Sequence, residues 1–138
     1  MANFLMVTSD TNLTAFKTYR IGQINGATTP TFSSFYQAVA KALSFPDDFE
    51  PSMESLEAFL FDLEWIPQKE VALYITDTAH FLAQEKETKV IELLDVLDVT
   101  AEDWKWEDEN PKNFKIILQE SPKIVSLLEK EEMAFDRL

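Results

Sequence analysis

One short apolar run constrains the fold of this chain more than any other feature. Residues 71–75 read Val-Ala-Leu-Tyr-Ile without a break, between polar segments that favour turns. A run of this length is typical of a strand that is buried on both faces, as in a parallel sheet covered by helices. Residues 114–118 form a second such strand, and residues 19–24, which end at the turn signal Asn25-Gly26, form another.

Two helical patterns lie between the predicted strands at residues 19–24 and 71–75. The first follows Thr31, ends before Pro46, and carries apolar residues at helical spacing, namely Phe32, Phe35, Tyr36, Val39 and Leu43. The second follows Ser52, a good N-cap residue, and its apolar stripe is Met53, Leu56, Phe59, Leu60 and Leu63. A sheet of parallel strands needs crossovers of this kind.

Two more helices complete the predicted architecture. Residues 88–98 have an apolar stripe, and Ser121-Pro122 opens a C-terminal helix that we expect to extend over about residues 121–137. The order of elements predicts an α/β domain with a small three-stranded, mainly parallel sheet and helices packed on it. We interpret residues 1–17 as an N-terminal arm. Residues 3–7 are apolar enough for a short strand, which leaves a long-looped hairpin with residues 18–24 open.

The charge of the chain limits its partners. With 25 acidic and 12 basic residues in a length of 138, the net charge is −13. Binding to nucleic acid or to an anionic membrane depends on Lys and Arg, so neither is expected. A strongly basic protein is the partner that such a surface attracts, although many intracellular proteins are acidic without any such partner.

Several kinds of chemistry lack the residues that they need. The chain has no Cys, one His (His80) and two Gly, which rules out thiolate sites, the usual metal clusters and glycine-rich phosphate loops. No cofactor or metal is therefore expected, and His80 is interpreted as a surface or capping residue. The N-terminus has no basic segment before an apolar core, and no run spans a membrane, so a cytoplasmic location is predicted.

Acidic residues gather in the loop and helix between residues 46 and 64. They are Asp47, Asp48, Glu50, Glu54, Glu57, Asp62 and Glu64. Such a cluster speeds the association of a basic partner and helps to select it, but a solvated helix face would look the same. Phe61 lies among these carboxylates, where it is either covered by a neighbouring element or exposed for binding.

The chain resembles the barstar family, small intracellular inhibitors of the ribonuclease barnase. The resemblance begins at Ile24-Asn25-Gly26, continues through Phe45-Pro46-Asp47-Asp48-Phe49, and follows the second helix from Leu56 to Leu60. It covers about residues 18–119, within one domain of residues 1–138. The excursion at residues 104–111, with Trp104 and Trp106, looks like an insertion whose Trp residues pack over a sheet edge.

The resemblance implies that the second helix and the loop before it plug a nuclease active site, where carboxylates replace RNA phosphates. Glu54 matches the family's first helical Asp, whereas Ala58 stands where the family has its dominant Asp. Glu57, Asp48 and Glu50 replace a Trp, a Tyr and a Gly, so the binding face is rewritten. A further acidic contact on the later helix would fall to Glu92 or Asp95.

The sequence thus predicts a protein inhibitor or immunity protein that blocks a basic nuclease or toxin domain, and not an enzyme. The predicted partner-binding residues are Asp47, Asp48, Glu50, Glu54, Glu57, Ala58 and Phe61. Two alternatives remain: a barstar-like module with a partner other than a nuclease, and an enzyme with a carboxylate site in a cleft. The oligomeric state is open, because the final amphipathic helix can pack on its own domain or on a second copy.

Overall fold

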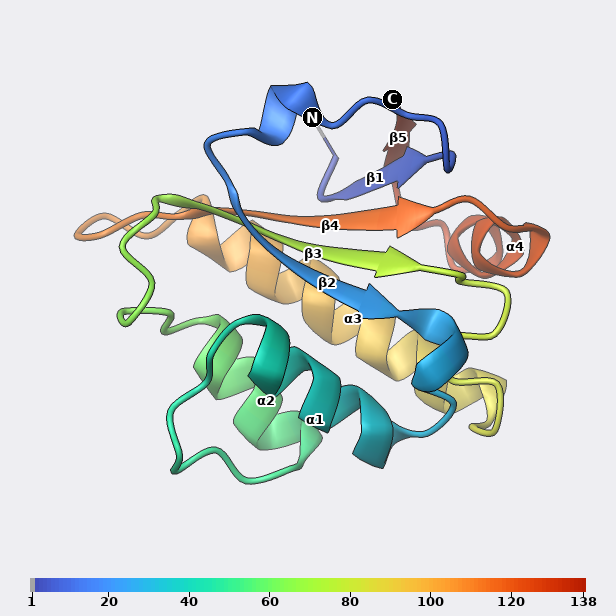
Figure 1. Ribbon diagram of the computed structural model, residues 1–138, viewed down its shortest axis with the longest axis horizontal. Coiled ribbons are helices and arrows are strands. Elements are labelled where there is room, and N and C mark those ends of the chain that lie inside the picture. Colours follow the sequence, from blue (N-terminus) through green and yellow to red (C-terminus); the bar gives the residue numbers. More distant parts are fainter. Residues whose placement is uncertain (1) are drawn as a thin grey trace.

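The computed structural model describes residues 2–138, which fold around one five-stranded, fully parallel sheet (Figure 1). The order of strands across the sheet is β2-β3-β4-β1-β5. The strands are β1 (Phe4–Val7), β2 (Arg20–Asn25), β3 (Glu70–Thr76), β4 (Asn113–Gln119) and β5 (Phe135–Arg137). The helices are α1 (Phe32–Ala42), α2 (Met53–Leu60), α3 (Glu87–Trp104) and α4 (Pro122–Lys130), with short 3-10 turns η1 (Thr14–Phe16) and η2 (Gly26–Thr28).

The α/β class and the three predicted strands, which are β2, β3 and β4, are confirmed, but the predicted total of three strands is wrong. β1, from the predicted N-terminal arm, lies between β4 and β5 and is parallel to both. It pairs Phe4 with Ile116 of β4, so the hairpin with residues 18–24 does not form. All four residues of β1 are buried, because a strand inside the sheet is covered on both faces.

The C-terminal segment also differs from the prediction. α4 ends at Lys130, and Glu132 adopts a left-handed conformation with φ of 55°, which breaks the helix. The chain then forms the three-residue strand β5 at the edge of the sheet. Phe135 fits the helical stripe by spacing, and so periodicity alone extended the helix too far.

The four helices and the main core occupy one face of the sheet. The core joins inward residues of β1 to β4 with the apolar stripes of α1 to α4, as in the stripe of α2, where Leu56 and Leu60 are fully buried. Leu13, Phe16 and Tyr19, from the segment between β1 and β2, pack in a smaller cluster on the opposite face. That segment lies on the side of the sheet away from α1, α2 and α3 (Figure 1).

The two-sided arrangement follows from the order of the strands. From β2 to β5 the chain moves across the sheet in one direction, with its helices on one face. The connection from β1 to β2 moves in the reverse direction, and it keeps the same crossover hand only by passing over the opposite face. No helix in residues 2–138 combines the length and hydropathy that crossing a membrane requires.

Local signals set the helix starts as the sequence predicts. Thr31 caps α1 in a reciprocal pair with Ser34, Ser52 caps α2 through the Ser55 amide, and Ser121 caps α4 ahead of Pro122. The third helix is longer than predicted: it continues past residue 98 to Trp104. Thr100, Ala101 and Trp104 are buried, so tertiary packing extends the helix into the predicted insertion.

Candidate functional site

The seven predicted partner-binding residues lie on one loop–helix unit, and the structure exposes the side chain of each. We call this set the loop–helix face: Asp47, Asp48, Glu50, Glu54, Glu57, Ala58 and Phe61. The first three lie in the loop after α1, and the others lie on α2 and its C-cap. The opposite side of α2 is buried in the core, which fixes the direction in which the face points.

An aromatic cluster supports the acidic loop from beneath. The ring centroid of Phe49 lies 4.9 Å from that of Phe45 and 5.2 Å from that of Phe59, both in edge-on contacts. Trp65 packs edge-on against Phe45, and its indole N–H donates to the carbonyl of Leu43 at 2.9 Å. Edge-to-face aromatic pairs add about 0.5–1.5 kcal/mol each beyond their buried area. The loop therefore rests on a packed base.

Hydrogen bonds fix the junction between the loop and α2. The hydroxyl of Ser52 accepts from the amide of Ser55 at 3.1 Å, and the hydroxyl of Ser55 accepts from the amide of Glu50 at 3.3 Å. Glu54 lies in the first turn of the helix, where a carboxylate meets the positive end of the helix dipole. The carboxylates are thus carried on an ordered backbone, which reduces the entropy lost when a partner binds.

The carboxylates of the face have no cationic partner within residues 2–138. Ion pairs elsewhere join Lys89 to Glu92, Lys105 to Glu102, Lys130 to Glu87 and Arg137 to Glu120, but none involves the loop–helix face. Five uncompensated negative charges on one exposed unit produce a negative local field, which is the kind that accelerates the arrival of a basic protein. The face therefore has the electrostatics of a docking surface for a cation-rich partner.

Phe61 is partly covered by a neighbouring element and partly exposed, so both alternatives left open by the sequence apply to it. It is 39% exposed, yet its ring packs edge-on against Trp104 at a centroid distance of 4.8 Å. The indole N–H of Trp104 donates to the carbonyl of Leu60 at 2.9 Å, so the ends of α2 and α3 are held together. One side of Phe61 is therefore fixed by α3, and the other side is available to a partner.

The other Trp of the predicted insertion behaves differently. Trp104 is buried against the end of α2, whereas Trp106 is 77% exposed in the turn that follows α3. Neither makes an aromatic pair with the other within the described residues. The expectation that both pack over a sheet edge is therefore wrong for Trp106.

The two acidic candidates on the later helix are exposed on α3. Glu92 forms an ion pair with Lys89, with 3.3 Å between the nitrogen and oxygen atoms, and Asp95 lies one turn further along. Burial raises the pKa of Tyr36 on α1, and the negative charges of Glu92 and Glu85 raise it further. The charge of Glu92 therefore acts on Tyr36 of α1.

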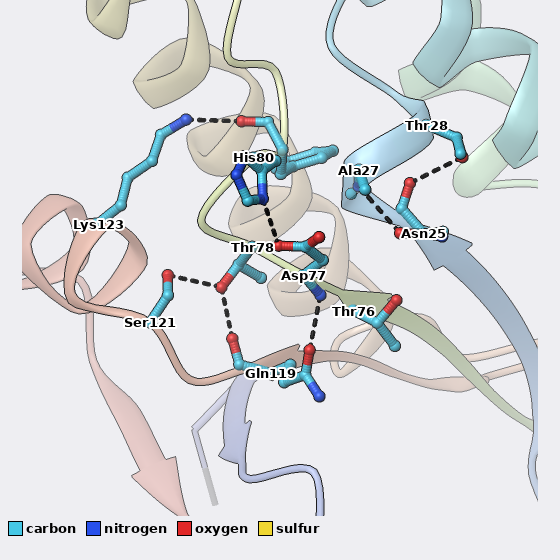
Figure 2. A network of polar contacts seen from close by, with 12 residues as sticks. Asn25, Ala27, Thr28, Thr76, Asp77, Thr78, His80, Gln119, Ser121 and Lys123 are labelled. Atoms are coloured by element: carbon cyan, nitrogen blue, oxygen red, sulfur yellow. Dashed lines mark hydrogen bonds and ion pairs between the residues drawn. The ribbon is translucent and has the colours of Figure 1, made fainter.

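A second polar region lies at the carboxyl ends of β2, β3 and β4, and Figure 2 shows its contacts. The amide of Asp77 donates to the side-chain oxygen of Gln119 at 2.7 Å, and the hydroxyl of Thr78 donates to the carbonyl of Gln119 at 2.5 Å. Thr78 also lies 2.7 Å from the hydroxyl of Ser121, which caps α4. We call these residues, with His80, the carboxyl-edge network.

His80 joins this network through its contact with Asp77. Its Nδ1 lies 2.7 Å from a carboxylate oxygen of Asp77, and 69% of its side chain is exposed. The nearby hydroxyls of Thr78 and Ser121 are already committed to each other, to a carbonyl and to the cap of α4. Hydroxyl activation requires a hydroxyl within reach of the base, and this arrangement holds both in structural roles. The hydrogen bonds of the network tie the loop after β3 to the end of β4.

Local sequence patterns carry no signal for most of the carboxyl-edge network. Gln119 and Ser121 follow one strand and Asp77 follows another, and only the parallel pairing of β3 with β4 brings them together. The common rule that carboxyl ends of parallel strands meet at one edge would find the region, but not its partners. In residues 2–138, no cluster of three or more His, Asp or Glu is placed to hold a metal ion.

The comparison with protein families agrees with this geometry. The model of the family described as Barstar (barnase inhibitor) matches residues 19–119, from the start of β2 to the end of β4, with the loop–helix face inside the match. A comparison with curated protein sequences finds no match. The family comprises non-enzymatic inhibitors. Since the match covers well over half of the sequence, the chain belongs to the Barstar (barnase inhibitor) family.

Proposed function

We propose that this chain is an inhibitor or immunity protein whose loop–helix face blocks the active site of a basic nuclease. The observation that supports the proposal is a set of five exposed carboxylates without cationic partners, held on an ordered loop and helix. A nuclease site must carry cations to bind RNA or DNA phosphates, and those cations are the complement of this face. The complex forms inside the cell that must be protected.

The residues at the centre of the loop–helix face indicate which groups the partner presents to it. Ala58 is exposed between Glu54, Glu57 and Phe61, so the middle of α2 offers a small apolar surface with acids around it. A buried aromatic anchor surrounded by charges is a common form of binding hot spot. The partner therefore presents an apolar residue opposite Ala58 and Phe61, with Lys or Arg residues around it. This partner differs from one that would place a cation against the family's central Asp.

The test is a capture experiment with three immobilised baits. The baits are the wild type, the Glu54→Lys/Glu57→Lys variant, and the control Glu129→Lys/Glu132→Lys. The control reverses two exposed acids at the same spacing, at the end of α4, and so produces the same change in net charge. Lysate of the source cell and a barnase-type ribonuclease are applied separately, and bound protein is eluted with rising salt.

The proposal predicts that the wild type and the control capture a basic nuclease and inhibit its activity. Reversing Glu54 and Glu57 weakens that complex on the order of 100-fold, because each lysine meets the partner's cations. Binding of the wild type weakens as salt rises, since exposed charges are screened. Equal capture by all three baits would move the binding site elsewhere. Capture of a partner without nuclease activity would replace the nuclease with another basic protein.

A further inference from the structure

A groove lies beside the loop–helix face, at the end of the sheet where β3 and β4 begin. It has a volume of about 520 Å³ and is formed by the segment after α2 and by the connection from α3 to β4. Both segments extend from the same end of the sheet in Figure 1. Cavities of a few hundred Å³ are of the size that accommodates small ligands or inserted side chains.

The lining of the groove combines an apolar floor with acidic walls. Trp104, Ile66, Pro67 and Pro111 supply the apolar part. Four carboxylates surround it, two from each segment: Asp62 and Glu64, and Glu107 and Glu109. None of the four has an ion-pair partner within residues 2–138. The long side chains of Lys and Arg have the matching character, because an apolar stem carries a charged head.

Two lysines also line the groove, and one of them is committed to the fold. The ammonium of Lys112 donates to the carbonyls of Ile66 at 2.8 Å and Gln68 at 2.6 Å. These bonds tie the connection after α3 to the segment after α2 and hold the two walls together. Burial lowers the pKa of Lys112. With Lys69, the lining has four negative and two positive charges, and so it remains net acidic.

The groove is continuous with the loop–helix face. Asp62, on its wall, directly follows Phe61, and the ring of Phe61 packs on Trp104, which lines the floor. The hydrogen bond from Trp104 to Leu60 fixes the distance between the face and the groove. A partner seated on α2 therefore has the groove immediately alongside it.

We propose that this groove binds a lysine- or arginine-bearing extended segment of the partner protein, which makes a second contact beside α2. The proposal rests on the proposed function only in assigning that segment to the same basic partner. The apolar floor contacts the stem of the cationic side chain, and the four carboxylates surround its head. Acids drawn from two separate chain segments match a polypeptide with several cations along its length.

The test titrates N-acetyl-hexa-arginine amide into ¹⁵N-labelled protein at low salt. Three proteins are compared: the wild type, Glu107→Gln/Glu109→Gln, and the control Glu129→Gln/Glu131→Gln. The control removes two exposed carboxylates with the same spacing from the end of α4. The indole N–H of Trp104 and the amides of residues 62–69 and 107–112 report on the groove, and those of residues 47–61 report on the loop–helix face.

The proposal predicts that the peptide shifts the groove signals and that the groove variant binds it about tenfold more weakly. The control stays within twofold of the wild type. An equal loss in both variants, or shifts confined to residues 47–61, would overturn the proposal. Spermidine at equal affinity would also overturn it, because a small polyamine would then replace the polypeptide segment.

Nuclease inhibition, measured with the same proteins, separates this inference from the proposed function. Peptide binding in the groove without inhibition of any nuclease would reject the proposed function and keep the groove as a cationic-segment site. Inhibition by the wild type, with identical peptide titrations for both variants, would reject the groove and keep the proposed function.

Discussion

The loop–helix face and the carboxyl-edge network are both polar, but they differ in where their polar groups are directed. In the network, the polar groups of Asp77, Thr78, Gln119 and Ser121 bond to one another and to the backbone. On the face, the carboxylates are exposed and have no ion-pair partner within residues 2–138. Polar groups bonded within the fold add stability, whereas uncompensated surface charge adds little stability and is available to a partner.

The comparison implies that the two regions respond to substitution in opposite ways. Changes in the carboxyl-edge network should lower the free energy of unfolding and leave the affinity of the folded protein for its partner unchanged. Changes on the face should lower affinity at nearly constant stability, since exposed substitutions usually alter stability by less than about 0.5 kcal/mol.

The largest effect on stability is expected for Gly26→Ala, next to the network. A Cβ atom at this position would lie 2.2 Å from the carbonyl oxygen of Asp77 and 2.6 Å from that of Thr76, and backbone atoms cannot turn aside as a side chain can. We expect a loss of about 3 kcal/mol, in the range of severe overpacking. Urea unfolding measures this loss in the free energy of unfolding.

Gly22→Ala is the matched control for that variant. Its Cβ would lie 2.7 Å from a methyl group of Leu43, a side-chain atom that can move, so a smaller loss is expected. Equal losses for the two variants would show that the backbone of the carboxyl edge adapts more easily than the network implies.

Phe49→Ala should affect both stability and binding, because Phe49 belongs to the base of the face rather than to its surface. The substitution removes the edge-on contacts with Phe45 and Phe59. We expect about 2 kcal/mol lower stability, at the low end for a truncated Phe because the ring is only partly buried. The looser loop should also weaken partner binding. Unfolding curves and affinities of the same samples would test both, and unchanged affinity would mean that loop order does not matter.

Ser52→Ala should produce an intermediate effect at the start of α2. It removes the cap on the Ser55 amide, for which about 1 kcal/mol is typical. The exchange of amide hydrogens in the first turn of α2 should become faster, while the carboxyl edge stays unchanged. Ser33→Ala, on an exposed helix position without a capping bond, is the control. Similar unfolding energies for both variants would contradict a capping role.

An effect of similar size but opposite sign is expected for a buried charge on β4, in contrast to the exposed charges of the face. Lys115 is 4% exposed and its ammonium donates to the carbonyl of Ala2 at 3.2 Å. Burial lowers its pKa from the usual 10.5, and Lys105 lowers it further. Between the folded pKa and 10.5 the unfolded chain binds more protons, so this group makes stability rise with pH in that window.

Lys115→Met should therefore stabilise the protein by about 1 kcal/mol at pH 7, because an apolar residue replaces a desolvated charge. The advantage over the wild type should narrow as the pH approaches 10. Urea unfolding at pH 7, 8, 9 and 10 measures the difference, with Lys17→Met as an exposed control. A constant difference across this range would show that Lys115 titrates as it does in the unfolded chain.

Much of the fold could be predicted from the sequence because its signals are local. The apolar run of β3, the stripe of α2 and the caps Thr31, Ser52 and Ser121 each depend on neighbouring residues. The place of β1 in the sheet, and the whole of β5, were missed because both strands are short and pair with segments far away in the sequence, such as Phe4 with Ile116 and with Phe135. Pairing at such distances leaves little trace in local periodicity.

In the candidate site too, some features follow from local sequence and others depend on contacts between distant segments. The acidic residues of the loop–helix face are close in sequence, and their exposure follows from the stripe of α2. The packing of Phe61 on Trp104, the acidic groove and the bonds of Gln119 depend on contacts between distant segments. Only the folded arrangement brings these groups together.

The most direct test of the central claim is an amide hydrogen-exchange footprint of the chain, free and bound to the nuclease that it captures. If the loop–helix face binds the nuclease, exchange in the bound form is slower at residues 46–61, with residues 77–82 and 119–123 at the carboxyl edge unchanged. Protection at the carboxyl edge, with residues 46–61 unchanged, would contradict it.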